Sequence, residues 1–247
     1  MLLVACMADD DYTVERGKTL SFSTDSIEFD TIISGQPTNT YTFQVYNKHK
    51  QAIRIPRVYI EGGSSSFFKV NVDGTYLEGG EASDFEIAAR DSLRVFLFVN
   101  AAETQADDPV KVEDKLVFVL ESGVQQNVVL SAYSQDVVQL KAKSIESDTT
   151  LDGKKPFQIF DSLVVEKGAT LTIDRGVRLY FHPGANLIVH GTLKVHGPLE
   201  EPVVMRGDRL GNMFSEQPYD RIPGQWGGVV FTGDSYGNYL NYCDIHS

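Results

Sequence analysis

Apolar and polar residues alternate in short segments along the first half of the chain. At 40–47, for example, Tyr41, Phe43 and Val45 alternate with polar neighbours, which is the two-residue period of a half-buried β-strand. Gly-, Ser- and Asn-rich stretches typical of turns separate these segments. The pattern predicts strands at residues 19–23, 26–30, 40–47, 53–60, 67–72, 92–99, 115–120 and 127–133.

Seven or eight strands at this spacing, with no helical period among them, predict an antiparallel β-sandwich of immunoglobulin-like type over residues 12–137. The Cys…Trp…Cys pattern of antibody-like domains is not in the sequence. The run at 26–60 resembles bacterial sandwich modules with an "F-x-x-v-x-x-G-x-x-x-x-x-x-f-x-v-x-N" signature. That resemblance implies a spacer or protein-contact domain.

The pattern changes in the second half of the chain. Single glycines bracket strands of about five residues, at Gly168, Gly176, Gly184, Gly191 and Gly197. Long hairpin arms joined by Asn-Gly or Asp-Gly are missing, so the strands are expected to stack rung on rung in a parallel β-helix. The expected inward pairs are Leu171 and Ile173, Leu179 and Phe181, Leu187 and Val189, and Leu193 and Val195.

This half also resembles the right-handed parallel β-helix proteins of the Bacteroidetes. The residues that carry the resemblance are "VEKGATLTIDRGVRLYF", "GTLKVHG" and "QWGGVVF", which occur in that order. We expect residues 138–160 to form a connector with a capping turn, and residues 161–247 to form the β-helix. Leu240, Cys243 and Ile245 are predicted core residues of a further rung. Because a solenoid needs a polar cap over its last rung, we expect the sequence to be a piece of a longer protein.

Composition narrows the classes of partner. The 247 residues are 42% hydrophobic and 23% charged, with a formal net charge of −12. Such an acidic chain disfavours nucleic acid, whose phosphates require clustered cations. No stretch reaches the roughly 18 apolar residues of a membrane-spanning helix. The two cysteines provide neither a disulfide framework nor a zinc-ligand cluster.

The first twelve residues, "MLLVACMADDDY", suggest how the protein is attached to a membrane. Residues 3–6 resemble a bacterial lipobox, in which Cys6 would receive the lipid. The following Asp9, Asp10 and Asp11 resemble the export signal of Bacteroidetes surface lipoproteins. The resemblance implies a lipid-anchored, surface-exposed protein of the bacterial outer membrane, which contacts the membrane through its anchor alone. Only five residues precede Cys6, fewer than a complete signal peptide needs.

Carboxylates are the first candidates for chemistry, because a glycosidase needs two of them across the scissile bond. The β-helix half offers Glu166, Asp174, Asp208, Asp220, Asp234 and Asp244, and no two of these share a short motif. The acidic runs at 78–86 and 103–108 could bind calcium but lack a regular ligand loop, so we expect solvated loops. No cofactor is expected.

Histidines and aromatic residues are the second set of candidates. His182, His190 and His196 stand near glycine corners and could stack across rungs, although a hydrogen-bonded corner histidine is favoured over a metal ligand. His49 is expected at the surface. Trp226, with Tyr219 and Tyr236 nearby, could stack on a sugar ring or fill a rung. The ligand candidates are therefore Trp226, Tyr219, Tyr236, His190 and His196. The Arg206-Gly207-Asp208 tripeptide is attributed to chance.

Together these features favour a non-catalytic surface lipoprotein that acts in adhesion or binds carbohydrate, with a polysaccharide or host glycan as partner. One alternative is a polysaccharide lyase or glycoside hydrolase with its site on the β-helix. Another is a structural scaffold of the cell envelope.

Overall fold

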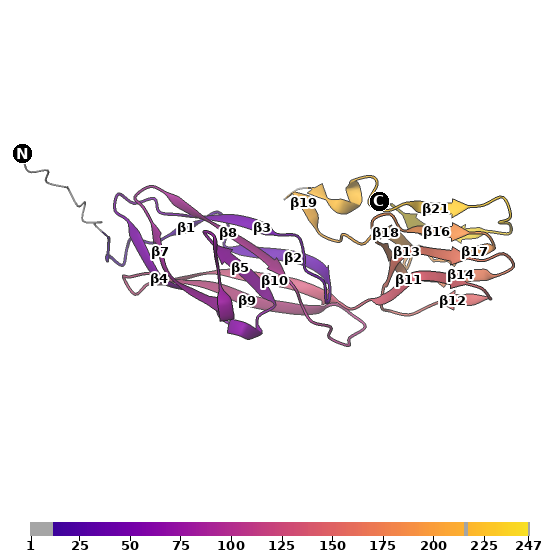
Figure 1. The fold of residues 1–247 in the computed structure, drawn as a ribbon, viewed down its shortest axis with the longest axis horizontal. Coiled ribbons are helices and arrows are strands. Elements are labelled where there is room, and N and C mark those ends of the chain that lie inside the picture. The colour runs from indigo at the N-terminus through magenta and orange to yellow at the C-terminus, as the bar shows by residue number, and fades with distance from the viewer. Residues whose placement is uncertain (1–11, 215–216, 247) are drawn as a thin grey trace, which may run out of the picture. The chain divides into compact units, whose positions relative to one another are not determined.

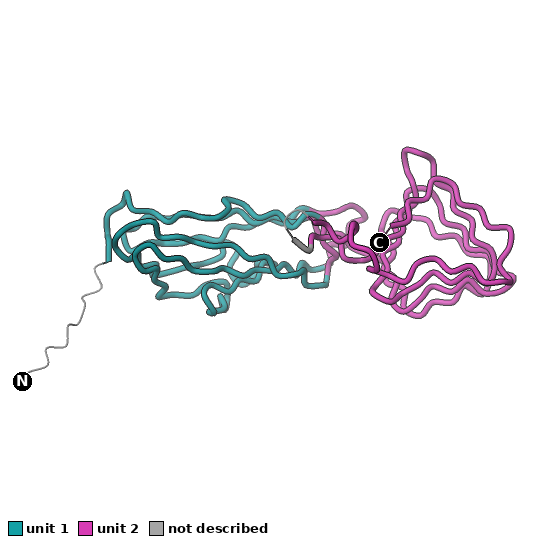
Figure 2. The backbone as a smooth tube through the Cα atoms, turned by 90° about the horizontal axis from the view of Figure 1, so that it is seen from above, with its two compact units in different colours: residues 1–30, 35–102, 111–132 teal, residues 31–34, 103–110, 133–247 magenta. Residues whose placement is uncertain are grey.

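The computed structural model describes residues 12–214 and 217–246. The predicted lipidation site Cys6 and the acidic residues Asp9, Asp10 and Asp11 lie outside these ranges. The chain divides into two compact units. The first contains the chain up to Asp30 with residues 35–102 and 111–132, and the second contains residues 31–34, 103–110 and 133 onward (Figure 2).

Two five-stranded sheets are built from the first part of the chain (Figure 1). In sheet order, one contains β1 (Ser21–Phe22), β3 (Tyr41–Tyr46), β8 (Ser92–Val99), β5 (Phe68–Val72) and β6 (Thr75–Tyr76). The other contains β2 (Ser26–Ile33), β10 (Gln125–Gln135), β9 (Val110–Val119), β4 (Ile53–Ile60) and β7 (Glu81–Ile87). The pairs β1–β3, β3–β8, β5–β8, β5–β6, β4–β7 and β4–β9 are antiparallel.

Aromatic contacts join the two sheets face to face. The rings of Phe22 on β1 and Phe118 on β9 lie 5.3 Å apart, and those of Phe29 on β2 and Phe68 on β5 lie 6.3 Å apart. The predicted alternation holds at Phe43 and Val45, which are buried. Tyr41 is 39% exposed instead.

The acidic run at 78–86 is not the loop that its composition predicts. It forms the 3-10 turn η2 (Glu78–Gly80) and most of β7, which pairs with β4. Phe85 and Ile87 are buried, while Glu81 forms an ion pair with Arg57. The period of two therefore holds at the end of β7, and its three acids, Glu81, Asp84 and Glu86, are all exposed. A further 3-10 turn, η1 (Gly63–Ser65), lies between β4 and β5.

The second part of the chain winds into a coil of parallel strands. Its strands are β11 (Val138–Ile145), β12 (Thr149–Leu151), β13 (Phe157–Val165), β14 (Thr170–Asp174), β15 (Arg178–Phe181), β16 (Asn186–Val189), β17 (Thr192–His196), β18 (Val203–Gly207), β21 (Gly228–Phe231), β22 (Tyr239–Asn241) and β23 (Cys243–Ile245). Each pairs in parallel with a strand one turn along the chain. The predicted β-helix is therefore present.

The coil has three sides, and Figure 2 shows its three-sided outline. The first side stacks the start of β11, the start of β13, β15, β18 and β23. The second stacks the ends of β11 and β13 with β16 and β21, and the third stacks β12, β14, β17 and β22. The corner between the first two sides falls inside β11 and β13, at Ala142 and Asp161, which both have positive φ.

The rungs begin earlier than the sequence pattern indicates. Residues 138–160, expected to form a connector, contain β11, β12 and the start of β13. Between β18 and β21 the chain leaves the coil and forms β19 (Asn212–Phe214), β20 (Gln217–Pro218) and the 3-10 turn η3 (Tyr219–Arg221). β19 and β20 pair antiparallel.

The core of the coil agrees with the expected inward pairs. All eight of those residues are fully buried: Leu171, Ile173, Leu179, Phe181, Leu187, Val189, Leu193 and Val195. The prediction is wrong for two residues of the last described rung, since Leu240 is 40% exposed and Ile245 is 44% exposed. Both occupy inward registers, opposite Val195 and Met205. They are exposed because, among the described strands, none stacks on β22 or β23 from the other side.

Candidate functional site

Four chemically different side chains align at the corner between the first two sides of the coil. Lys141 pairs in register with Phe160. The backbone N–H of His182 donates to the carbonyl of Ile159, and that of Asp208 donates to the carbonyl of Phe181, so these residues continue the same line on the next two rungs. Because neighbouring strands lie roughly 4.8 Å apart, Lys141, Phe160, His182 and Asp208 form a regularly spaced row, which we call the corner row.

Each member of the corner row contacts the next. The Nζ atom of Lys141 lies 5.4 Å from the centroid of the Phe160 ring, a cation–π distance. The Phe160 and His182 rings lie 4.9 Å apart at 38°. His182 Nδ1 lies 2.8 Å from Asp208 Oδ2. Cation, aromatic ring, imidazole and carboxylate are therefore linked along one edge of the coil.

Asp208 fixes the orientation of the imidazole. Its side chain is only 7% exposed, and the Nε2 atom of the fully buried Gln158 donates to the same Oδ2 at 2.9 Å. An acceptor at 2.8 Å assigns the His182 proton to Nδ1. With its side chain 51% exposed, His182 then has an oriented Nε2 available to a ligand.

A second line of polar residues runs beside the corner row. Gln158, Tyr180 and Arg206 occupy the same position on successive rungs. Burial raises the pKa of Tyr180, and the charges of Arg178 and Arg206 oppose that rise. The Nη1 atom of Arg206 lies 3.5 Å from Asp220 in η3, so the chain between β18 and β21 covers part of this line.

Trp226 does not lie where a sugar could stack on it. Its ring stacks on Phe181 at 4.2 Å and 16°, its Nε1 donates to the carbonyl of His246, and it is 8% exposed. The structure therefore supports the core role of Trp226 and contradicts its role as an exposed sugar platform.

The other ligand candidates are spread over the coil. The ring of Tyr219 faces the guanidinium of Arg209, the residue after Asp208, at 5.2 Å. Tyr236 is 77% exposed. His190 Nδ1 lies 3.1 Å from the Thr232 hydroxyl, and His196 lies beside Tyr239 on the third side. The structure does not bring these side chains into one site.

The candidate carboxylates have separate partners. Glu166 accepts a hydrogen bond from Ser144, Asp234 forms an ion pair with Lys167, and Asp244 contacts His246. Asp174 is in register with His196. Among the described residues, no group of three or more His, Cys, Asp and Glu side chains could hold a metal ion.

Two minor motifs are also placed. Arg206 and Gly207 lie within β18, and the side chain of the following Asp208 is almost fully buried, so this tripeptide is not a protruding loop. His49 lies in a turn, where its Nε2 contacts the carbonyl of Thr19 at 3.0 Å.

Sequence reasoning missed Lys141, Phe160 and Gln158 as site residues because all three fall in the expected connector. Phe157, Ile159 and Leu163 show a period of two that marks β13, and this was the available signal. Which residues meet across rungs depends on the lengths of the intervening turns, and these differ from rung to rung.

The family of pectate-lyase-like β-helix domains matches residues 143–244. This match supports the β-helix and fits a carbohydrate-related role. Protein bark beetle of Drosophila melanogaster is 33% identical over 95 residues. The alignment covers 36% of this chain and 3% of that protein.

Solved structures show only distant likeness. A protein from Porphyromonas gingivalis has a TM-score of 0.35 at 15% identity, over 52% of this chain and 60% of its own. The PapD-like domain of human CEP192 has a TM-score of 0.31 at 11% identity, over 49% and 87%. A family 123 glycoside hydrolase from Clostridium perfringens has a TM-score of 0.34 at 6% identity, over 47% and 26%. Scores this low support no inference about function.

Within residues 12–214 and 217–246, no helix has the length and hydropathy required to cross a bilayer.

Proposed function

We propose that the coil binds carbohydrate without altering it, and that the corner row is the binding site. One observation carries the proposal: the Phe160 ring is only partly buried and lies between the Lys141 ammonium and the oriented His182 imidazole. Small-ligand sites combine an apolar surface with a few fixed polar groups. The corner row has both.

The chemistry of the row suits a sugar ring. The C–H groups of a pyranose can pack on the exposed edge of the Phe160 ring, because Lys141 and His182 lie over its two faces. Hydroxyl groups at its edge can accept from Lys141 and hydrogen-bond with His182 Nε2. Because the row crosses four rungs, it favours an extended chain of sugars over a single unit.

The alternative function is cleavage of a polysaccharide, and the His182–Asp208 pair favours it. A carboxylate on Nδ1 leaves Nε2 able to accept a proton, as in general-base catalysis. Glu166, Asp234 and Asp244 have partners elsewhere. Among the described residues, no group of three or more His, Cys, Asp and Glu side chains accompanies the pair. We therefore place binding first.

The cellular setting is part of the same proposal. A lipid on Cys6 would anchor the protein at the outer surface of a bacterial outer membrane, with Asp9, Asp10 and Asp11 directing export. There the coil would bind a polysaccharide or host glycan in adhesion. A pure scaffold of the envelope would have no such ligand.

A glycan array with the purified protein tests the proposal. Saturable binding that weakens about tenfold in Phe160→Ala is the expected result. Unchanged glycan affinity in Phe160→Ala would place the binding site elsewhere on the protein. No binding to any glycan on the array would favour the alternative function as an envelope scaffold. Release of unsaturated products or reducing ends from a polysaccharide panel, lost in His182→Ala, would establish the enzyme.

A further inference from the structure

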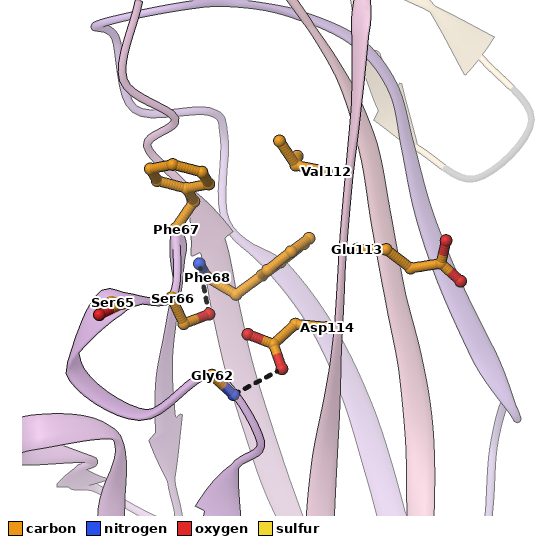
Figure 3. A pocket seen from close by; sticks show the side chains of 8 residues that line it. All are labelled: Gly62, Ser65, Ser66, Phe67, Phe68, Val112, Glu113 and Asp114. Carbon is orange, nitrogen blue, oxygen red and sulfur yellow. Dashed lines mark hydrogen bonds between the residues drawn. The ribbon is translucent and has the colours of Figure 1, made fainter. Parts of the chain in front are cut away.

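A second candidate site lies in the first unit, between β5 with its preceding turn η1 and β9. It is a hollow of about 300 Å³, shown in Figure 3. Phe67, Phe68 and Val112 line it, and the carboxylate of Asp114 lies at its base near Gly62. Phe67 is 36% exposed whereas Phe68 is 2% exposed, so the hollow has an accessible aromatic wall above the sealed core.

The hollow exists because β4 covers only part of β9. The register between them runs from Arg57 opposite Val119 to Ile60 opposite Leu116. Beyond Ile60 the chain turns through η1 toward the other sheet. Within the described sheet, no further strand lies on that side of β9. The backbone of residues 111–114 therefore has an edge able to accept another strand.

Of the charged side chains along this edge, the carboxylate of Asp114 has no cationic partner among the described ion pairs. Lys111 forms an ion pair with Glu113, and Lys115 forms one with Glu61. Asp114 Oδ1 accepts the backbone N–H groups of Gly62 and Lys115. Among the described ion pairs, none neutralises Asp114. A carboxylate and an exposed phenyl ring that line the same hollow are complementary to a cation on an apolar stem.

The loop that forms one wall is held in place before any ligand arrives. Asp114 caps Gly62 at 3.0 Å, and Ser66 Oγ accepts the N–H of Phe68 at 3.2 Å. Gly80 packs so closely on Gly63 that a Cβ there would meet its backbone at 2.5 Å. A preformed wall lowers the entropy lost on binding.

We propose that this hollow binds an extended segment of a partner protein, which pairs with residues 111–114 of β9 and places one arginine side chain in the hollow. The arginine stem packs on Phe67 and Val112. Its guanidinium meets the free Oδ2 of Asp114. This contact is independent of the carbohydrate site.

Fluorescence anisotropy with a labelled acetyl-Val-Arg-Val-amide peptide tests the proposal, with the Gln peptide as reference. Asp114→Asn keeps an oxygen that can cap Gly62 but removes the charge, and we expect it to weaken Arg-peptide binding about fivefold. Asp25→Asn is the matched control, because Asp25 is exposed between β1 and β2 and does not line the hollow. It should leave binding unchanged.

Hydrogen exchange adds a readout of strand pairing. The bound Arg peptide should slow exchange at residues 111–114, and Phe67→Ala should reduce that protection. Equal affinity for the Arg and Gln peptides, or equal losses in Asp114→Asn and Asp25→Asn, would overturn the role of the carboxylate. No binding of either peptide to the wild-type protein would overturn the proposal as a whole.

Discussion

Asp136 is the residue on which three segments of the second unit converge. Its carboxylate accepts the hydroxyl of Ser34 at 2.7 Å and the backbone N–H groups of Thr104 and Gln105 at 3.0 and 2.7 Å. Lys155 Nζ lies 3.5 Å away. Burial, the largest influence, raises the pKa of Asp136, but these hydrogen bonds and the lysine charge together hold it below 3.8. The ionised carboxylate is therefore a structural tie.

Replacing Asp136 with Asn should destabilise the protein by about 1–3 kcal/mol at pH 7, because buried N–H donors lose a charged acceptor. The lowered pKa adds stability that is complete above the ordinary value and is lost as pH falls through the folded-state pKa. Urea unfolding between pH 7 and pH 3 should therefore show that the difference in free energy of unfolding between wild type and Asp136→Asn becomes smaller in acid. The exposed Asp152→Asn is the control. A constant gap would contradict the charged role.

Cys243 gives a second test at the scale of one residue. Burial, with a smaller contribution from Asp244, raises the pKa of its thiol to about 11. The reactive species is the thiolate, so at pH 8 its fraction should be about a hundredfold below that of an unperturbed thiol. The Cys6→Ser variant leaves Cys243 as the remaining cysteine. Its rate of labelling by a disulfide reagent should be low at pH 8 and should increase up to pH 11. A rate equal to that of free cysteine at pH 8 would refute this burial.

At the scale of elements, the glycine corners of the coil have two different causes. Gly168, Gly176 and Gly184 have φ of +86°, +70° and +84°, in the left-handed region that favours glycine. Gly191 does not, but a Cβ there would meet the carbonyl oxygen of Ala169 at 2.2 Å. Position 191 therefore requires glycine because the backbone of the rung below leaves no room for a Cβ atom.

Gly191→Ala should therefore destabilise the coil by several kcal/mol, because backbone rather than a flexible side chain blocks the added methyl group. Thermal unfolding followed by circular dichroism measures the loss. Gly233→Ala is the matched control, since a Cβ at Gly233 has no atom within 4 Å and the residue has no positive φ. Equal melting temperatures for the two variants would contradict the proposed stacking.

Elements with clean alternation could be predicted from the sequence, and those masked by charge could not. Leu171 and Ile173 marked an inward face that the structure confirms. In β7, three acids hid the buried Phe85 and Ile87. In β11, Lys141 and Lys143 suggested a solvated connector although the strand is paired along its length.

At the scale of the whole molecule, the two kinds of architecture were predictable but the candidate sites were not. Composition and period separate a set of antiparallel sheets from a stacked coil. The corner row depends instead on registers between rungs, and the hollow depends on where β4 leaves β9. Neither is encoded in a local pattern. Trp226, the most conspicuous aromatic residue in the sequence, is in the core.

The central claim, that the corner row binds carbohydrate, is tested most directly by an NMR titration with the best glycan from the array. The backbone amides of Lys141, Phe160 and His182 should shift with saturation, and Phe160→Ala should weaken binding about tenfold. Tyr236→Ala should bind the glycan with wild-type affinity. The amides around His196 should not shift during the titration. Shifts confined to Tyr236 and His196, with wild-type affinity in Phe160→Ala, would contradict the account.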